Sequence, residues 1–231
     1  MKQVIPVLLV GLMGMSAIGV ARAGYITGTL WENNPNAGNA AIANIPTGPT
    51  TTPYVTFTAN AVQFSSFGNA GNTGNGSLDY TVGSWLTSLG AANNIVYYNG
   101  AASTDPLWQS GGTPCPCNGS FIALTGTDYF TTGQSFTVTQ DDGLQMRVGS
   151  AGSPQFVFSN PGPTSPVTST HTYTGNTGDF AFTFAYGECC GAPAVLETNL
   201  AAPGSVPEPS TLALLGLGLA GLGFAWRKRK A

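Results

Sequence analysis

The sequence predicts an all-β protein, an antiparallel jelly-roll-like β-sandwich, and three observations support this class. Glycine is abundant, with 32 among 231 residues, and charged residues make up only 7% of the chain. The helix-favouring lysine and glutamate are therefore scarce. Apolar residues come in short runs separated by Gly, Asn, Asp and Pro, and regularly spaced short strands with turn signals between them are typical of sandwiches and barrels.

The N-terminus has the pattern of a secretory signal peptide, which we expect over residues 1–23. Lys2 precedes an apolar run from Val4 to Val20, and Ala21-Arg22-Ala23 supplies the A-x-A exit of such peptides. Signal peptidase is therefore expected to cleave after Ala23, with an uncleaved anchor as the alternative. Cleavage leaves a secreted segment over residues 24–205, which is the size of one domain.

The first half of the secreted segment gives weaker strand signals. Gly24–Pro53 is rich in Asn, Pro and Thr, and we expect an irregular lead-in or one edge strand there. Tyr54–Ala59 alternates apolar and polar residues, which predicts a half-buried strand. Ser84–Gly90 predicts a single helical turn that ends at Gly90, and Ile95–Tyr98 predicts another strand.

From Ser120 onward the strand pattern is sharper, with Gly, Asp or Pro between the candidates. In one of them Phe180, Phe182, Phe184 and Tyr186 fall on a single face, which we expect to face the core. A sugar-stacking platform is the alternative for this aromatic stripe. The seven strand candidates are Ser120–Leu124, Gln134–Thr139, Leu144–Val148, Gln155–Phe158, His171–Tyr173, Phe180–Tyr186 and Ala194–Thr198.

The secreted segment is acidic. Of the seven Lys and Arg residues in the chain, only Arg147 lies in it. Nucleic acid and anionic lipid both require a basic footprint on a protein, so the composition argues against both as partners. Calcium and neutral sugars remain compatible with it. The acidic residues are Glu32, Asp79, Asp105, Asp128, Asp141, Asp142, Asp179, Glu188 and Glu197.

The chemically suggestive point of this segment is Gln140-Asp141-Asp142-Gly143, between two strand candidates. Adjacent carboxylates repel each other, so Asp141 and Asp142 in a tight turn gain from a hard cation, and Ca²⁺ accepts oxygen ligands from such loops. The alternative is a hairpin turn in which Asp142 and Gly143 adopt positive φ. Calcium at Asp141 and Asp142 is the one cofactor that the sequence suggests.

Four cysteines, Cys115, Cys117, Cys189 and Cys190, lie in the secreted segment. Their even number in an exported chain favours disulfides, with three possible full pairings. A bond between the adjacent Cys189 and Cys190 closes a strained ring, and one across Pro116 is barely less cramped. We therefore expect the two pairs to bridge to each other. Four-thiolate zinc is the alternative, but these spacings suit tetrahedral chelation poorly.

The sequence gives little support for catalysis, and we expect no enzyme. His171 is the only histidine and is most simply interpreted as a strand residue. No Gly-x-Ser-x-Gly elbow and no His-Glu-x-x-His motif occurs. Carboxylate pairs for glycoside hydrolysis are recognised by their separation in space, which a sequence does not give. No catalytic residue is therefore assigned.

The C-terminal residues 206–231 have three parts in a fixed order. Val206-Pro207-Glu208-Pro209-Ser210 is followed by an uncharged apolar run, Leu212–Trp226, and by the basic cluster Arg227-Lys228-Arg229-Lys230. A helix over the run is about 22 Å long. Spanning a hydrocarbon core of about 30 Å then requires the first basic side chains to snorkel or the bilayer to thin. The basic cluster is expected to stay cytoplasmic.

This tail resembles the PEP-CTERM sorting signal of exported bacterial proteins, and residues 206–210 match its motif as they stand. The resemblance implies recognition at the inner membrane by an exosortase, a membrane protease or transpeptidase of bacteria that make exopolysaccharide. Cleavage near the motif and delivery to the cell surface or matrix follow from the same resemblance. An ordinary tail anchor with a chance Pro-Glu-Pro is the alternative.

A second resemblance covers residues 120–200. Gly133–Gly149, with its Asp-Asp-Gly turn, and Tyr173–Glu188, with its Gly-rich entry into an aromatic strand, look like the β-sandwich of anthrax protective antigen, glycosidase inserts and yeast flocculins. In lectin members of that family the paired aspartates hold calcium, which binds sugar hydroxyls. By position this role falls on Asp141 and Asp142. The family's remaining calcium ligands have no match in this sequence. The resemblance therefore supports the fold more strongly than it supports calcium or sugar binding.

The sequence thus predicts an exported surface or matrix protein that exosortase sorts and that associates with exopolysaccharide in a biofilm. The alternative is a calcium-dependent carbohydrate-binding module, a lectin or adhesin, that uses the Asp141-Asp142 turn. The two differ in whether glycan binding depends on a chelatable cation.

Overall fold

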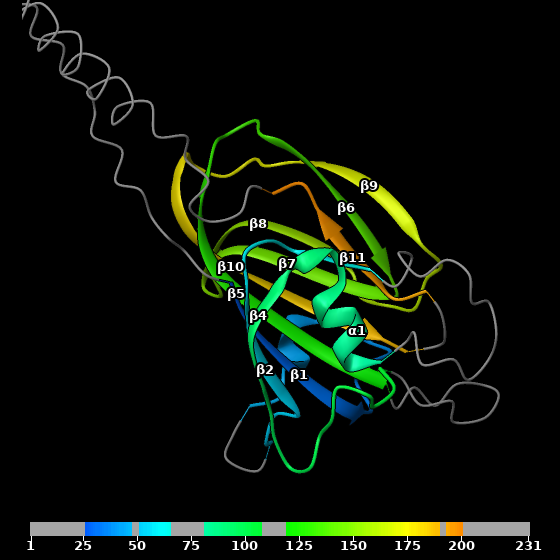
Figure 1. The fold of residues 1–231 in the computed structure, drawn as a ribbon. Helices are drawn as coiled ribbons and strands as arrows, with labels where there is room; N and C mark the ends of the chain where they lie inside the picture. The colour runs from blue at the N-terminus through cyan, green and yellow to red at the C-terminus, as the bar shows by residue number, and fades with distance from the viewer. Residues whose placement is uncertain (1–25, 48–50, 66–80, 108–118, 190–192, 201–231) are drawn as a thin grey trace, which may run out of the picture. The chain divides into compact units, whose positions relative to one another are not determined.

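The structure, a computed structural model, describes residues 26–47, 51–65, 81–107, 119–189 and 193–200. These residues form two antiparallel sheets that pack face to face (Figure 1), so the predicted all-β sandwich is confirmed. The expected signal peptide and the expected apolar helix of the tail lie outside the described residues. Within the described ranges no helix is long and apolar enough to cross a membrane.

The larger sheet has seven strands and the smaller has four, and every pairing in both is antiparallel. The order in the larger sheet is β4 (Ala92–Tyr97), β2 (Val55–Ala59), β1 (Ile26–Asn34), β5 (Gly119–Phe130), β10 (Gly178–Glu188), β7 (Gly143–Ser150) and β8 (Ser153–Asn160). The order in the smaller sheet is β3 (Gln63–Ser65), β11 (Val195–Thr198), β6 (Ser135–Asp141) and β9 (Val167–Thr172).

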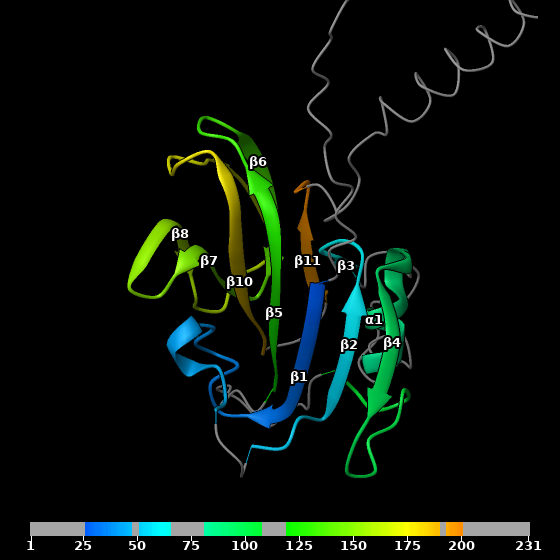
Figure 2. The same cartoon turned by 90° about the vertical axis from the view of Figure 1, so that its left-hand side faces the viewer.

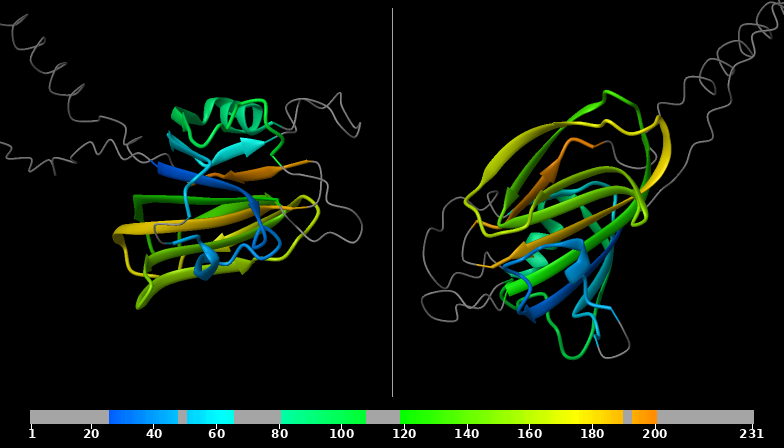
Figure 3. Two further views of the ribbon diagram at one scale, coloured as in Figure 1. Left: turned by 90° about the horizontal axis from the view of Figure 1, so that it is seen from below. Right: turned by 180° about the vertical axis from the view of Figure 1, so that it is seen from behind.

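One α-helix, α1 (Val82–Thr87), packs against β3 and β4 (Figure 3). Thr81 caps it with a capping box, because its side chain accepts the Ser84 N–H while the Ser84 side chain bonds back to the Thr81 N–H. The helix continues into a 3-10 turn, η4 (Ser88–Gly90), which confirms the expected helical turn that ends at Gly90. A second 3-10 turn, η1 (Ile42–Asn44), follows β1.

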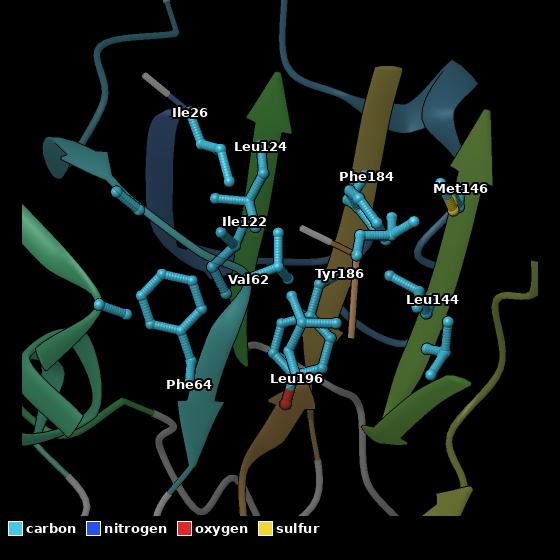
Figure 4. Close-up of a cluster of buried hydrophobic side chains, with 14 of the residues drawn as sticks. Ile26, Val62, Phe64, Ile122, Leu124, Leu144, Met146, Phe184, Tyr186 and Leu196 are labelled. Atoms are coloured by element: carbon cyan, nitrogen blue, oxygen red, sulfur yellow. The ribbon is translucent and has the colours of Figure 1, made fainter. Parts of the chain in front are cut away.

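The core lies between the two sheets (Figure 4) and is rich in aromatic side chains. Phe184 and Tyr186 of β10 are fully buried, and Phe182 is 4% exposed, so the aromatic stripe faces the core as expected. Trp85 of α1 stacks between Phe64 and Tyr186, with ring centroids at 4.7 and 5.7 Å. Stacked aromatic pairs add about 0.5–1.5 kcal/mol each to the energy of area burial, so this stack fastens α1 to the sandwich.

The sequence interpretation of Gly24–Pro53 is wrong in one respect. Ile26–Asn34 forms β1, which is neither irregular nor at an edge, because it lies between β2 and β5 in the larger sheet. Ile26 and Leu30 point into the core, with Gly28 between them. A Cβ at Gly28 would lie 2.1 Å from the ring of Phe57, so the aromatic ring of the neighbouring strand fills the space that a side chain would take.

A Gly187→Ala variant is expected to be destabilised by about 2–3 kcal/mol. The added Cβ would lie 2.0 Å from the carbonyl oxygen of Ala37, and a backbone atom yields less readily than the end of a flexible side chain. Urea unfolding measures the loss. Gly152→Ala is the matched control, because its Cβ meets nothing within 4 Å and surface changes of this kind stay within about 0.5 kcal/mol. Equal midpoints for the two variants would contradict this close packing.

Candidate functional site

The Asp141-Asp142-Gly143 segment passes from one sheet to the other. Asp141 ends β6, which pairs with β9 and β11, whereas Gly143 begins β7, which pairs with β8 and β10. The hairpin interpretation is therefore wrong, because the two flanking strands belong to different sheets. Neither Asp142 nor Gly143 has positive φ, and the Asp141-Asp142 peptide bond is cis. We call residues 140–143 the crossover.

Close packing holds the crossover against the end of β8. A Cβ at Gly143 would lie 2.1 Å from the carbonyl oxygen of Pro161, so only glycine fits at this position. The Gln140 side-chain amide donates to the carbonyls of Asp142 and Asn160, at 3.1 and 3.2 Å. The first bond lies within the crossover, and the second ties Gln140 to the end of β8.

Asp142 joins three segments of the chain through its carboxylate. One oxygen accepts the Thr164 N–H at 3.2 Å, and the other accepts the Cys189 N–H at 2.8 Å. Backbone N–H donors stabilise the charged form of a carboxylate. Asp141 and Asp142 are 7% and 5% exposed, so both acids are held in a largely desolvated site.

Behind the two aspartates lies a third acid, Glu188, which is fully buried. The Tyr186 hydroxyl contacts Glu188 Oε2 at 2.8 Å and also bonds to the Asp141 carbonyl. A tyrosine has one proton, and a carbonyl only accepts. The Tyr186 hydroxyl therefore shares its one proton between the Asp141 carbonyl and Glu188 Oε2.

The electrostatics of this cluster favour protonated acids in the absence of a cation. Burial, the charge of Asp142 and a hydrogen bond with Asp142 together raise the pKa of Asp141 to about 7. Burial also raises the pKa of Glu188 well above its usual value, as do the charges of Asp142 and Asp141, against the opposing hydrogen bond from Tyr186. The Oε1 atom of Glu188 is buried without a hydrogen-bond partner. Burial and the neighbouring charges therefore hold Asp141 and Glu188 toward their protonated forms.

These features bear on the predicted calcium site. The structure brings the two aspartate carboxyls together, and a hydrogen bond between them is one cause of the raised pKa of Asp141. A hard cation can take the place of the proton that such a pair shares. The donor set therefore fits one side of a calcium site, through Asp141 and Asp142. Among the described residues no group of three His, Cys, Asp or Glu side chains is placed to hold a metal ion.

Sequence analysis did not place Tyr186 and Glu188 in the site. The signal was present, since Glu188 follows Phe182, Phe184 and Tyr186 with the same period of two and must lie on the same inward face. An acid that continues an aromatic core stripe is a buried charge, and buried charges collect at functional sites.

The structure describes only one of the four cysteines for which disulfides are predicted. Cys189 is 2% exposed and lies directly after β10, where its N–H binds Asp142. Cys115, Cys117 and Cys190 lie outside the described residues, so the pairing stays a prediction. A bridge from Cys189 to the segment before β5 would fix the end of β10 beside the crossover.

Comparisons with known proteins agree with the interpretation of the tail. Residues 205–230 match the family model of the PEP-CTERM protein-sorting motif. This range contains Val206–Ser210 and the basic cluster Arg227–Lys230. The chain therefore carries a sorting signal that implies processing by exosortase and a membrane-transit precursor bound for the cell surface. A comparison with curated proteins gives no significant match.

Two solved structures are similar to the chain over most of its length. The crystal structure of the PA14 domain of MpAFP antifreeze protein is 20% identical, covers 79% of this chain and 84% of its own, and has a TM-score of 0.48. The PA14 sugar-binding domain from an RTX adhesin is 16% identical, covers 76% of this chain and 89% of its own, and has a TM-score of 0.41.

Proposed function

We propose that this chain, which carries the sorting motif behind an exportable β-sandwich, is a surface or matrix protein that associates with exopolysaccharide after exosortase processing. The match over residues 205–230 carries the sorting half of this proposal. The acidic, nearly lysine-free sandwich supports the other half, because a neutral glycan needs no basic footprint. The proposed role is binding and structural, with no catalytic step.

One face of the larger sheet supports contact with an uncharged polymer. Thr58, Thr27, Thr125 and Thr183 are successive partners on β2, β1, β5 and β10, so their side chains form one row across the sheet. Thr27 and Thr125 are exposed. Neighbouring strands are about 4.8 Å apart, so the row presents hydroxyl and methyl groups at a short, regular spacing. Such a surface suits a neutral, repetitive glycan.

Co-sedimentation with the exopolysaccharide of a bacterium that makes the protein tests the proposed association. We expect the processed protein to pellet with the polysaccharide and to be released when a glycosidase degrades it. Thr27→Lys with Thr125→Lys places two charges in the row and is expected to reduce the pelleted fraction. Protein that stays in the supernatant with intact polysaccharide would contradict the proposal.

The second candidate function is calcium-dependent carbohydrate binding at the crossover. The observation that favours it is the pair of desolvated carboxyls at Asp141 and Asp142, which are hydrogen-bonded to each other. Calcium would be held by these two carboxylates and would present open coordination positions to vicinal sugar hydroxyls. A bound cation would in turn favour the charged form of Glu188, which lies directly behind the pair.

We expect saturable calcium binding when the full-length protein is titrated in a non-ionic detergent at about pH 7.5. Calorimetry measures the binding. Extracellular modules bind calcium with Kd of about 10⁻⁴–10⁻³ M, and binding to the folded state alone should raise Tm. The Asp141→Asn, Asp142→Asn double variant should lose both effects. Asp128→Asn with Asp179→Asn, a second acid pair whose charges interact, is the matched control. Retained binding in the first variant would exclude the crossover as the site.

A further inference from the structure

A cavity of about 220 Å³ lies where β1 ends and β2 begins. These two strands lie side by side in the ribbon of Figure 2. Its walls include two aromatic residues, Trp31 and Tyr54, and two amides, Asn33 and Asn99. Glu32 also lines it. None of these residues belongs to the crossover, so the cavity is a separate feature of the sandwich. A cavity with aromatic walls and a few polar groups is typical of a ligand site.

A pair of acids lies at this cavity. The Tyr54 hydroxyl donates to Asp105 Oδ2, which also accepts the Ala102 N–H at 2.6 Å. Tyr54 also hydrogen-bonds to the Glu32 side chain, so the hydroxyl lies between the two carboxyls. Burial and the charge of Asp105 raise the pKa of Glu32 to about 7 against this bond. Glu32 Oε1 is buried and has no hydrogen-bond partner.

The part of the chain that the structure describes supplies no cation to this acid pair. Arg147 is the only Lys or Arg between Ala23 and Trp226. It lies on β7, which is separated from β1 by β5 and β10 in the sheet. Leaving a buried carboxylate oxygen without a donor costs about 1–3 kcal/mol or more. The natural complement of the cavity is therefore a ligand that brings a positive charge and N–H donors.

We propose that this cavity binds the ammonium group of an amino sugar, a hexosamine with a free amine. The ammonium would donate to Glu32 and gain from the charge of Asp105, while Trp31 and Tyr54 offer aromatic faces to the cation and to the sugar ring. The Asn33 and Asn99 amides would bind ring hydroxyls. The choice of a sugar rests on the proposed association with exopolysaccharide, whereas the need for a cation comes from the cavity itself.

A neutral sugar would satisfy the cavity less well. Its hydroxyls can donate to Glu32, but they leave the charges of two neighbouring carboxylates uncompensated. A charge-assisted hydrogen bond is about twice as strong as a neutral one. We therefore expect the cavity to bind a hexose with a charged amino group more tightly than a hexose with a neutral hydroxyl in its place.

Saturation-transfer NMR at about pH 7 tests the proposal with three probes, glucosamine, N-acetylglucosamine and glucose. The full-length protein is used in a polyoxyethylene detergent, because a detergent with a sugar headgroup would compete. Glucosamine is expected to bind at least about tenfold more tightly than the other two. Equal signals from all three sugars, or none from glucosamine, would overturn the proposal. The wild-type protein alone therefore decides the choice of ligand.

A Glu32→Gln variant locates the site. It removes a desolvated charge and should leave Tm unchanged or raised, while the affinity for glucosamine falls at least about tenfold. Glu197→Gln on β11, in the other sheet, is the matched control and should bind as the wild type does. Unchanged affinity in the Glu32 variant would overturn the proposal. Glucosamine binding should persist in chelator and in the Asp141→Asn, Asp142→Asn variant. A failure of the proposed amino-sugar site can therefore be distinguished from a failure of the proposed calcium site at the crossover.

Discussion

A chain with Pro207→Ala, Glu208→Ala and Pro209→Ala is expected to remain an uncleaved membrane precursor and to disappear from the cell surface. These three residues lie within the matched sorting motif. A proline disfavours helix at its own position and at the residue before it, so the sequence favours an extended segment here, the form in which a protease binds a substrate. Glu208 supplies the one charge of the motif. Three alanines would instead favour helix at these positions.

Mass spectrometry of surface and membrane fractions measures this processing. Wild-type protein at the surface should lack the peptide that contains Arg227–Lys230, whereas the triple variant should retain it in the membrane fraction. Pro203→Ala is the matched control, because it changes a proline just outside residues 205–230. Surface protein with an intact basic cluster would show that the tail is an ordinary anchor.

The sandwich is expected to lose several kcal/mol of stability as the pH rises from about 5 to about 8 without a divalent cation. Glu32 and Asp141 each have a pKa raised to about 7, and that of Glu188 is raised well above its usual value. In this pH range the folded chain binds more protons than the unfolded chain, so deprotonation favours unfolding.

One group acts in the opposite direction. Burial lowers the pKa of His171, so its contribution grows as the pH rises through its ordinary value. One histidine does not cancel three carboxyls, and the net slope stays negative. Urea unfolding in chelator at several pH values measures it.

Glu188→Gln isolates the fully buried acid. Glutamine keeps an oxygen and gains an N–H that can reach Tyr186, but it has no charge to desolvate. We therefore expect higher stability than wild type at pH 8 and a flatter pH profile. Glu197→Gln, at a half-buried position of β11, is the control. A profile as steep as that of the wild type would show that Glu188 is not a main source of the pH dependence.

The local patterns in the sequence predicted those elements whose side chains alternate clearly. The aromatic stripe of β10 and the alternation of β2 placed both strands and their buried faces correctly. The sequence did not predict β1 as an internal strand, because Gly28 interrupts the apolar residues of its core-facing side. The ring of Phe57 from β2 fills the space beside Gly28. When a neighbouring strand supplies the side chain that fills one core-facing position, the strand itself does not show a complete alternation of apolar and polar residues.

The crossover was misjudged for a different reason. Asp-Gly between two strands is a strong hairpin signal when only neighbouring residues are considered. The partners of β6 and β7 come from later in the chain, in β9, β11, β8 and β10. Pairing is decided by the whole core, so the sequence could identify the two aspartates but not the buried setting that Tyr186 and Glu188 give them.

The pairing of β5 also determines when the chain can fold during export. In the larger sheet β5 pairs with β1 and β10, in registers that join residues as distant as Thr27 and Thr125, or Ser120 and Glu188. Sheets built from such distant partners fold slowly, in milliseconds to seconds. A chain that crosses the membrane N-terminus first therefore presents β1 outside well before β5 or β10 arrives. The sandwich stays unfolded through most of translocation and closes only as the sorting tail reaches the membrane.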